Sequence, residues 1–208
     1  RGTITLTHDV VPDARAAVLP YLPRVGIAVQ LGKLHRIFGR YSEAFALEEY
    51  RLAHIPPGSD DVQRRLGGLS NLAVSRHQLG DYAGALKIDQ QVAEERARLF
   101  GDVNYWTMLS ESNVARDLYG LGRYTDALEI MERVLPNARR ELGARHDQPL
   151  LGARTVAIAA RKSGDLDRAL AESRENYLNC QGTYQADHEN TLAAAMTYAN
   201  TLCSTGQI

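Results

Sequence analysis

Two clusters of histidine and acidic residues carry the side chains best suited to chemistry. His146 and Asp147 form one cluster, and Asp187, His188 and Glu189 form the other, with the two histidines 42 residues apart. Imidazole nitrogens and carboxylate oxygens are both ligands for divalent metals, so a metal-dependent enzyme is one hypothesis. The same residue types also cap the first turn of a helix, and capping requires no ligand. We favour capping and predict no metal site.

Other signatures of catalysis are missing from the sequence. Ser, Cys and His occur without a nucleophile elbow, and neither a phosphate-binding loop nor a dinucleotide fingerprint is present. Cys180 and Cys203 are 23 residues apart, with no Cys-x-x-Cys spacing and no histidines in zinc register. They are interpreted as ordinary small core or surface residues of a protein in a reducing compartment. We predict a chain that is not an enzyme and uses no cofactor.

Composition indicates a folded and mostly helical protein. Hydrophobic residues make up 44% and charged residues 24% of the chain, and the helix formers Ala, Leu, Glu and Arg recur throughout. The formal net charge of -1 gives no sign of a nucleic-acid or membrane-surface partner. No apolar run approaches the ~20 residues that a membrane span needs. These features predict a cytoplasmic protein that binds neither nucleic acid nor membrane.

A glycine-centred pattern recurs every 41 or 42 residues and organises the whole chain. An alanine follows each of the first four glycines by five residues, and a Phe or Leu comes directly after that alanine. Apolar residues at three- and four-residue steps both precede and follow the glycines, as in two amphipathic helices joined by a turn. The glycines are Gly39, Gly80, Gly122, Gly164 and, in the last position, Gly206. The period therefore predicts an array of helix pairs.

The array is predicted to span residues 24–208 and to be preceded by a different segment. Residues 1–23 contain three prolines and are interpreted as a leader or an N-terminal cap. The predicted repeats cover about 24–58, 59–101, 102–143, 144–186 and a half repeat at 187–208. Because repeats bury their cores only against neighbours, the abrupt start and end suggest a fragment of a longer protein. An uncovered half repeat also predicts self-association through that end.

The centre of each repeat resembles the tetratricopeptide repeat (TPR), with Leu-Gly-x-Tyr-x-x-Ala-Leu at residues 121–128. The longer period, the Asn71-Leu72-Ala73 triplet and the Asp-His-Glu-Asn-Thr-Leu loop at 187–192 are similar to the kinesin-light-chain variety of the family. Such arrays also resemble bacterial TPR proteins, including stand-alone actinobacterial ones, and the sensor regions of NB-ARC or STAND signalling proteins. The resemblance implies an all-α fold: an α-solenoid of antiparallel helix pairs in a right-handed superhelix.

The resemblance further implies that the first helix of each repeat lines a concave groove. Residues three, six, nine and ten positions before the turn glycine would face it. The partner-binding residues expected from these positions are Lys33, Arg36, Asn71, His77, Asn113, Arg116, Tyr119, Arg154, Arg161 and Asn200. Arginine pairs with carboxylates, and asparagine bonds to an extended backbone, so the expected partner is a protein or peptide that is acidic or has a free C-terminus. The opposing interpretation is a solvated face in a chain with 21 Arg and 3 Lys.

Two functions of different classes follow from this pattern. The first is a non-catalytic scaffold that binds proteins or peptides in a locally basic groove. The alternative is the ligand-sensing C-terminal arm of a STAND or NB-ARC-type NTPase whose catalytic domain lies outside these residues, so that a ligand releases that domain by reshaping the array.

Overall fold

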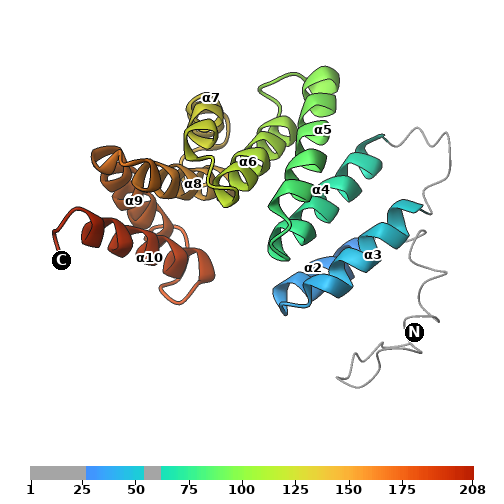
Figure 1. Cartoon of the computed structure of the whole chain (residues 1–208), viewed down its shortest axis with the longest axis horizontal. Helices are drawn as coiled ribbons and strands as arrows, with labels where there is room; N and C mark the ends of the chain where they lie inside the picture. Colours follow the sequence, from blue (N-terminus) through green and yellow to red (C-terminus); the bar gives the residue numbers. More distant parts are fainter. Residues whose placement is uncertain (1–26, 54–61) are drawn as a thin grey trace. The chain divides into compact units, whose positions relative to one another are not determined.

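The computed structural model describes residues 27–53 and 62–208 of the chain (Figure 1). Within these two ranges the chain forms nine helices and no strand. The helices are α2 (Ile27–Ile37), α3 (Tyr41–Ala53), α4 (Val62–Gln78), α5 (Tyr82–Phe100), α6 (Tyr105–Gly120), α7 (Tyr124–Leu142), α8 (Asp147–Ser163), α9 (Leu166–Gln181) and α10 (Glu189–Ser204). The segment predicted as a leader, residues 1–23, lies outside the described residues. The all-α prediction is confirmed for the described part.

The chain divides into two compact units, Arg1–Leu79 and Gly80–Ile208. In the first unit, α3 packs against both α2 and α4. In the second unit each helix from α5 to α10 packs against the next one along the chain. The first helices also meet one another there, because α8 contacts both α6 and α10. Consecutive packing of this kind is the arrangement of an α-solenoid.

The turn between α6 and α7 explains the recurring glycine. Gly122 has φ of 77°, a left-handed conformation in which a side chain is strained. The N–H of Arg123 donates to the carbonyl of Leu118 at 2.9 Å, which closes the end of α6 in the manner of a Schellman motif. A Cβ at Gly122 would meet no atom within 4 Å, so space is not the constraint. The backbone conformation alone requires glycine at this position.

Alanines at fixed distances from the turns allow the helices of the second unit to approach closely. Ala115 in α6 and Ala157 in α8 lie seven residues before their turn glycines and are completely buried. Ala127 in α7 and Ala169 in α9 lie five residues after theirs and are equally buried. Larger apolar side chains, among them Met131 of α7, fill the remaining core. Small residues at the closest approach and large ones beside them give the dense packing of a protein interior.

Candidate partner-binding face

Six of the ten residues predicted to bind a partner lie on three helices of the second unit. Residues three, four or seven apart share one side of a helix, so the members from each helix lie on the same side of it. α8 contacts both α6 and α10, so the three helices that carry them are neighbours. We call these six residues the first-helix face: Asn113, Arg116 and Tyr119 of α6, Arg154 and Arg161 of α8, and Asn200 of α10. Asn113 is buried and Asn200 is exposed, while the other four are partly buried.

The arginines of the first-helix face lack acidic partners. Arg116, Arg154 and Arg161 form no ion pair with any residue in the described ranges. Nε and Nη2 of Arg116, and Nε of Arg161, are buried and have no hydrogen-bond partner among the described residues. Buried donors without an acceptor are unfavourable, and an arginine presents five donors in a planar fork. Arg116 and Arg161 therefore each keep at least one buried donor that the described residues do not satisfy.

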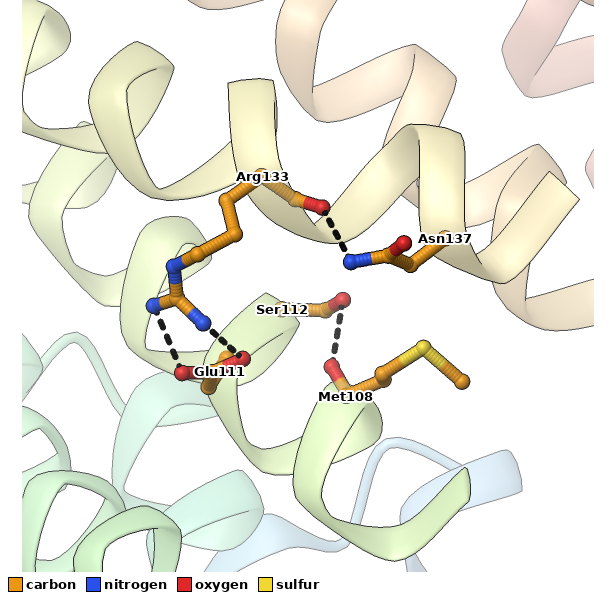
Figure 2. A network of polar contacts seen from close by, with 5 residues as sticks. All are labelled: Met108, Glu111, Ser112, Arg133 and Asn137. Carbon is orange, nitrogen blue, oxygen red and sulfur yellow. Dashed lines mark hydrogen bonds and ion pairs between the residues drawn. The ribbon is translucent and has the colours of Figure 1, made fainter. Parts of the chain in front are cut away.

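Three arginines of the second helices form ion pairs with acids of neighbouring helices. Arg133 of α7 donates two hydrogen bonds to the carboxylate of Glu111 in α6, at 3.0 and 2.7 Å (Figure 2). Arg168 of α9 pairs with Glu132 of α7 at 2.8 Å. Arg139 of α7 pairs with an acid of α9, Glu172, at 2.9 Å. Positive charge is thus compensated within the chain at these positions but not on the first-helix face.

Asn113 has an amide group without an internal partner. Its side chain is 8% exposed and makes no hydrogen bond with the described residues. The neighbouring Ser112 behaves differently: its hydroxyl donates to the carbonyl of Met108 at 2.8 Å (Figure 2) and accepts from Nε2 of Gln148 at 3.1 Å. Ser112 therefore links α6 to α8. The Asn113 amide keeps both its donor and its acceptor capacity.

A buried pair of carboxyl groups lies beside Arg116. Asp89 of α5 and Asp117 of α6 are both completely buried. Burial, followed by the negative charge of Asp117, raises the pKa of Asp89 to about 8, and the positive charges of Arg116 and Arg96 offset only part of this effect. At neutral pH Asp89 therefore holds a proton. The charge of Arg116 is one of the groups that act on this buried carboxyl pair.

Sequence reasoning missed Asp89. The residue occupies a helix position that is apolar in the following repeat, where Met131 stands 42 residues later. An acidic residue at a core position of an otherwise regular repeat is the signal that could have found it.

A second such acid, Glu48 of α3, lies 41 residues before Asp89 and is also completely buried. Glu48 accepts a hydrogen bond from Nε of Arg51 at 2.8 Å. Burial raises the pKa of Glu48, and the hydrogen bond and charge of Arg51 counteract that shift.

In the first unit the predicted residues are partly engaged with one another. Nη2 of Arg36 donates to Oδ1 of Asn71 at 3.4 Å, which joins α2 to α4. Lys33 is exposed on α2, and His77 is partly buried on α4. Arg36 is therefore not equivalent to Arg161, although both lie three residues before a turn glycine. The first-helix face of the second unit is the stronger candidate for an anionic partner.

The histidines considered as metal ligands are helix caps. Nδ1 of His146 accepts the N–H of Gln148, and Nδ1 of His188 accepts the N–H of Asn190, both at 3.2 Å. His146 and His188 are the N-cap residues of α8 and α10. Asp147, next to His146, accepts a hydrogen bond from the Tyr184 hydroxyl. In the described part of the chain no three metal-ligating side chains come together. The capping interpretation is confirmed.

The cysteines are a core and a surface residue, as the sequence predicts. Cys180 is buried in α9 and Cys203 is exposed in α10, and both are free thiols. Cys180 lines a shallow cleft between α8, α9 and α10, together with Arg154 and Asn176. Burial raises the pKa of the Cys180 thiol, and the charge of Arg154 counteracts the shift. Among the described helices none has the length and apolar character needed to cross a membrane.

The family of the chain follows from a direct match. The model of the tetratricopeptide repeat family matches residues 65–140 and 106–175, and the chain belongs to this family. TPR arrays of this kind are, as a class, scaffolds that bind proteins or peptides rather than catalysts. No curated protein sequence matches the chain.

Solved structures with a similar fold come from kinesin-light-chain-type arrays. A single-residue variant of the Podosopora anserina kinesin light chain with nearly identical TPR-like repeats superposes with a TM-score of 0.71 at 21% identity, covering 90% of this chain and 89% of that one. The parent form superposes with a TM-score of 0.68 at 21% identity, covering 89% of this chain and 88% of that one. BtubC (BKLC) from P. vanneervenii superposes with a TM-score of 0.69 at 16% identity, covering 93% of this chain and 79% of that one. These likenesses concern the fold, and they confirm the predicted TPR-type α-solenoid.

Proposed function

We propose that this chain is a non-catalytic TPR scaffold that binds an acidic, extended protein segment on the first-helix face of its second unit. One observation carries the proposal. Arg116, Arg154 and Arg161 have no ion-pair partner among the described residues, whereas Arg133, Arg139 and Arg168 of the second helices are paired. The free cysteines suit a cytoplasmic place of action.

The chemistry of the first-helix face suits an acidic segment or a free C-terminus. Each guanidinium group can hold a carboxylate through two parallel hydrogen bonds. The Asn113 amide can donate to one backbone carbonyl and accept from one backbone N–H of an extended peptide. The ring of Tyr119, half-buried beside Arg116, adds apolar contact area.

Defined peptides test this proposal. The probes are a fluorescent peptide rich in Asp and Glu, its Asn- and Gln-substituted counterpart, and each of the two with an amidated C-terminus. We expect the acidic peptide to bind, with an affinity that falls as salt rises from about 50 to 300 mM, since partly exposed charges are screened. Asn113→Ala should weaken binding further without changing the salt dependence. Equal affinity for acidic and neutral peptides would contradict the proposed charge recognition.

We also infer that the uncovered side of α10 associates with a second copy of the chain. Leu192 is 56% exposed and Met196 is 68% exposed. The residues at the position of Leu192 in earlier repeats, Leu66, Met108 and Leu150, are exposed by no more than 3%. Two exposed apolar side chains on one side of a helix, one of them at a position that earlier repeats bury, favour association.

A further inference from the structure

Three equivalent helix caps differ in one chemically important respect. Asn104, His146 and His188 follow one another at intervals of 42 residues and are the N-caps of α6, α8 and α10. All three have extended backbone conformations, with φ between -66° and -75°. Each side chain accepts the N–H two residues further on, at 2.9 Å for Asn104 and at 3.2 Å for the two histidines. The caps have the same geometry but use different acceptors.

The two kinds of acceptor respond differently to protons. The amide oxygen of Asn104 accepts a hydrogen bond at every physiological pH. A histidine Nδ1 accepts only in the neutral ring, with the proton on Nε2, and becomes a donor when the ring is protonated. Imidazole is the side chain that ordinarily changes charge between pH 5 and 8. A protonated ring would also place a positive charge at the positive end of a helix dipole, which is unfavourable.

The two histidine caps have different neighbours. The His188 ring stacks on Tyr184 with centroids 4.2 Å apart, and the Tyr184 hydroxyl donates to Asp147 of α8. Asp187 and Glu189 flank His188 in the sequence.

The His146 ring meets the edge of the Tyr105 ring from α6, with centroids 6.0 Å apart. Exposed Arg145 and Asp147, of opposite sign, flank it.

We propose that His146 and His188 make the first turns of α8 and α10 sensitive to pH, while the first turn of α6, capped by Asn104, is insensitive. Protonation of the two rings removes the side-chain cap at both helices and leaves their first N–H groups without an acceptor. This effect of pH concerns the stability of the two helices and does not depend on a bound partner. It would loosen the two helices that carry Arg154, Arg161 and Asn200.

Hydrogen exchange at single-residue resolution, corrected for the intrinsic effect of pH, tests the proposal in the free protein. Between pH 7.5 and 5.5 we expect the first-turn amides of α8 and α10 to lose protection by about fivefold, or about 1 kcal/mol, the usual effect of losing a cap. The equivalent amides of α6 should keep theirs. In the double variant His146→Asn/His188→Asn the loss should disappear. The reverse change, Asn104→His, should introduce it into α6.

Nitrogen chemical shifts of the imidazole rings give a second readout that does not depend on these variants. At pH 7.5 both rings should show an unprotonated Nδ1 and a protonated Nε2. A proton on Nδ1 at this pH, or protection of α8 and α10 that is the same at both pH values, would overturn the proposal. Persistence of the pH effect in the double asparagine variant would overturn it as well.

Discussion

At the scale of single residues, the most informative feature is an acid that the fold keeps neutral. Asp89 is completely buried against Asp117, and burial together with that second carboxyl raises its pKa to about 8. The positive charge of Arg96 offsets part of this shift, while its Nη1 donates to the Ser110 hydroxyl at 2.7 Å and its guanidinium lies over the Trp106 ring at 5.4 Å. A protonated acid is therefore built into the packing of α5 on α6.

The raised pKa of Asp89 predicts a dependence of stability on pH. In the unfolded chain this carboxyl ionises above about pH 4, whereas in the folded chain it keeps its proton until about pH 8. The free energy of unfolding should thus fall as pH rises through this window, by up to about 1.4 kcal/mol per pH unit. Asp89→Asn, which is neutral and of the same size, should flatten this slope in denaturation experiments at pH 5 to 8. Exposed Asp167→Asn should leave the slope as it is, and an unchanged slope in Asp89→Asn would refute the assignment.

At the scale of elements, the turns decide where one helix ends and the next begins. Gly67 and Gly122 both have room for a side chain, since a Cβ would meet nothing within 4 Å at either site. They differ in backbone conformation: Gly122 has a φ of 77°, and Gly67 lies inside α4. Substitutions at these two glycines therefore distinguish the effect of backbone strain from the effect of steric fit.

Substitutions at these two glycines should have opposite effects. Gly122→Val should destabilise the protein by at least ~1 kcal/mol, because a β-branched residue is strained at positive φ. Gly67→Ala should stabilise it by about 0.5–1 kcal/mol, because alanine is the better helix former. Chemical denaturation measures both changes. Equal midpoints for Gly122→Val and the parent protein would show that the turn tolerates a side chain.

The exposed apolar side chains of α10 should make the oligomeric state of the protein depend on its concentration. Light scattering is expected to show a mass that rises with protein concentration, because Leu192 and Met196 are exposed on α10. Leu192→Gln/Met196→Gln should keep the protein monomeric while leaving its helical content unchanged. Exposed Leu178 of α9, substituted in the same way, is the matched control. A parent protein that stays monomeric at all concentrations would rule out association through this helix.

At the scale of the whole molecule, patterns of residues close in the sequence predicted the helix-pair architecture better than the candidate partner-binding face. Glycine turns, buried alanines and helix caps each depend on a few residues close in the sequence, so their spacing indicated the helix pairs. The pairing of arginines depends on which acids the neighbouring helices bring near. Arg36 and Arg161 hold the same position in their repeats, yet only Arg36 bonds to an asparagine of the next first helix. Likewise the burial of Asp89 against Asp117 depends on how α5 packs on α6.

The division into two compact units also has no signal in the repeat pattern. The period of 41 or 42 residues runs through the boundary at Leu79 and Gly80 without interruption. A repeat array is held together by contacts between neighbours, so its cooperativity depends on the strength of each interface rather than on the period. Sequence spacing reports the presence of repeats but not how strongly each one is coupled to the next.

Calorimetric titration with an acidic peptide tests the central claim, that the first-helix face recognises negative charge. Arg116→Glu/Arg161→Glu should weaken binding more than tenfold, roughly 1.4 kcal/mol or more. The control Arg140→Glu/Arg174→Glu makes the same change in net charge at exposed positions of α7 and α9, and should lower the affinity by less than about threefold. Circular dichroism must show the same helical content in all three proteins. If the first pair of substitutions leaves the affinity unchanged, or lowers it no more than the control pair does, the arginines of the first-helix face do not form the binding site.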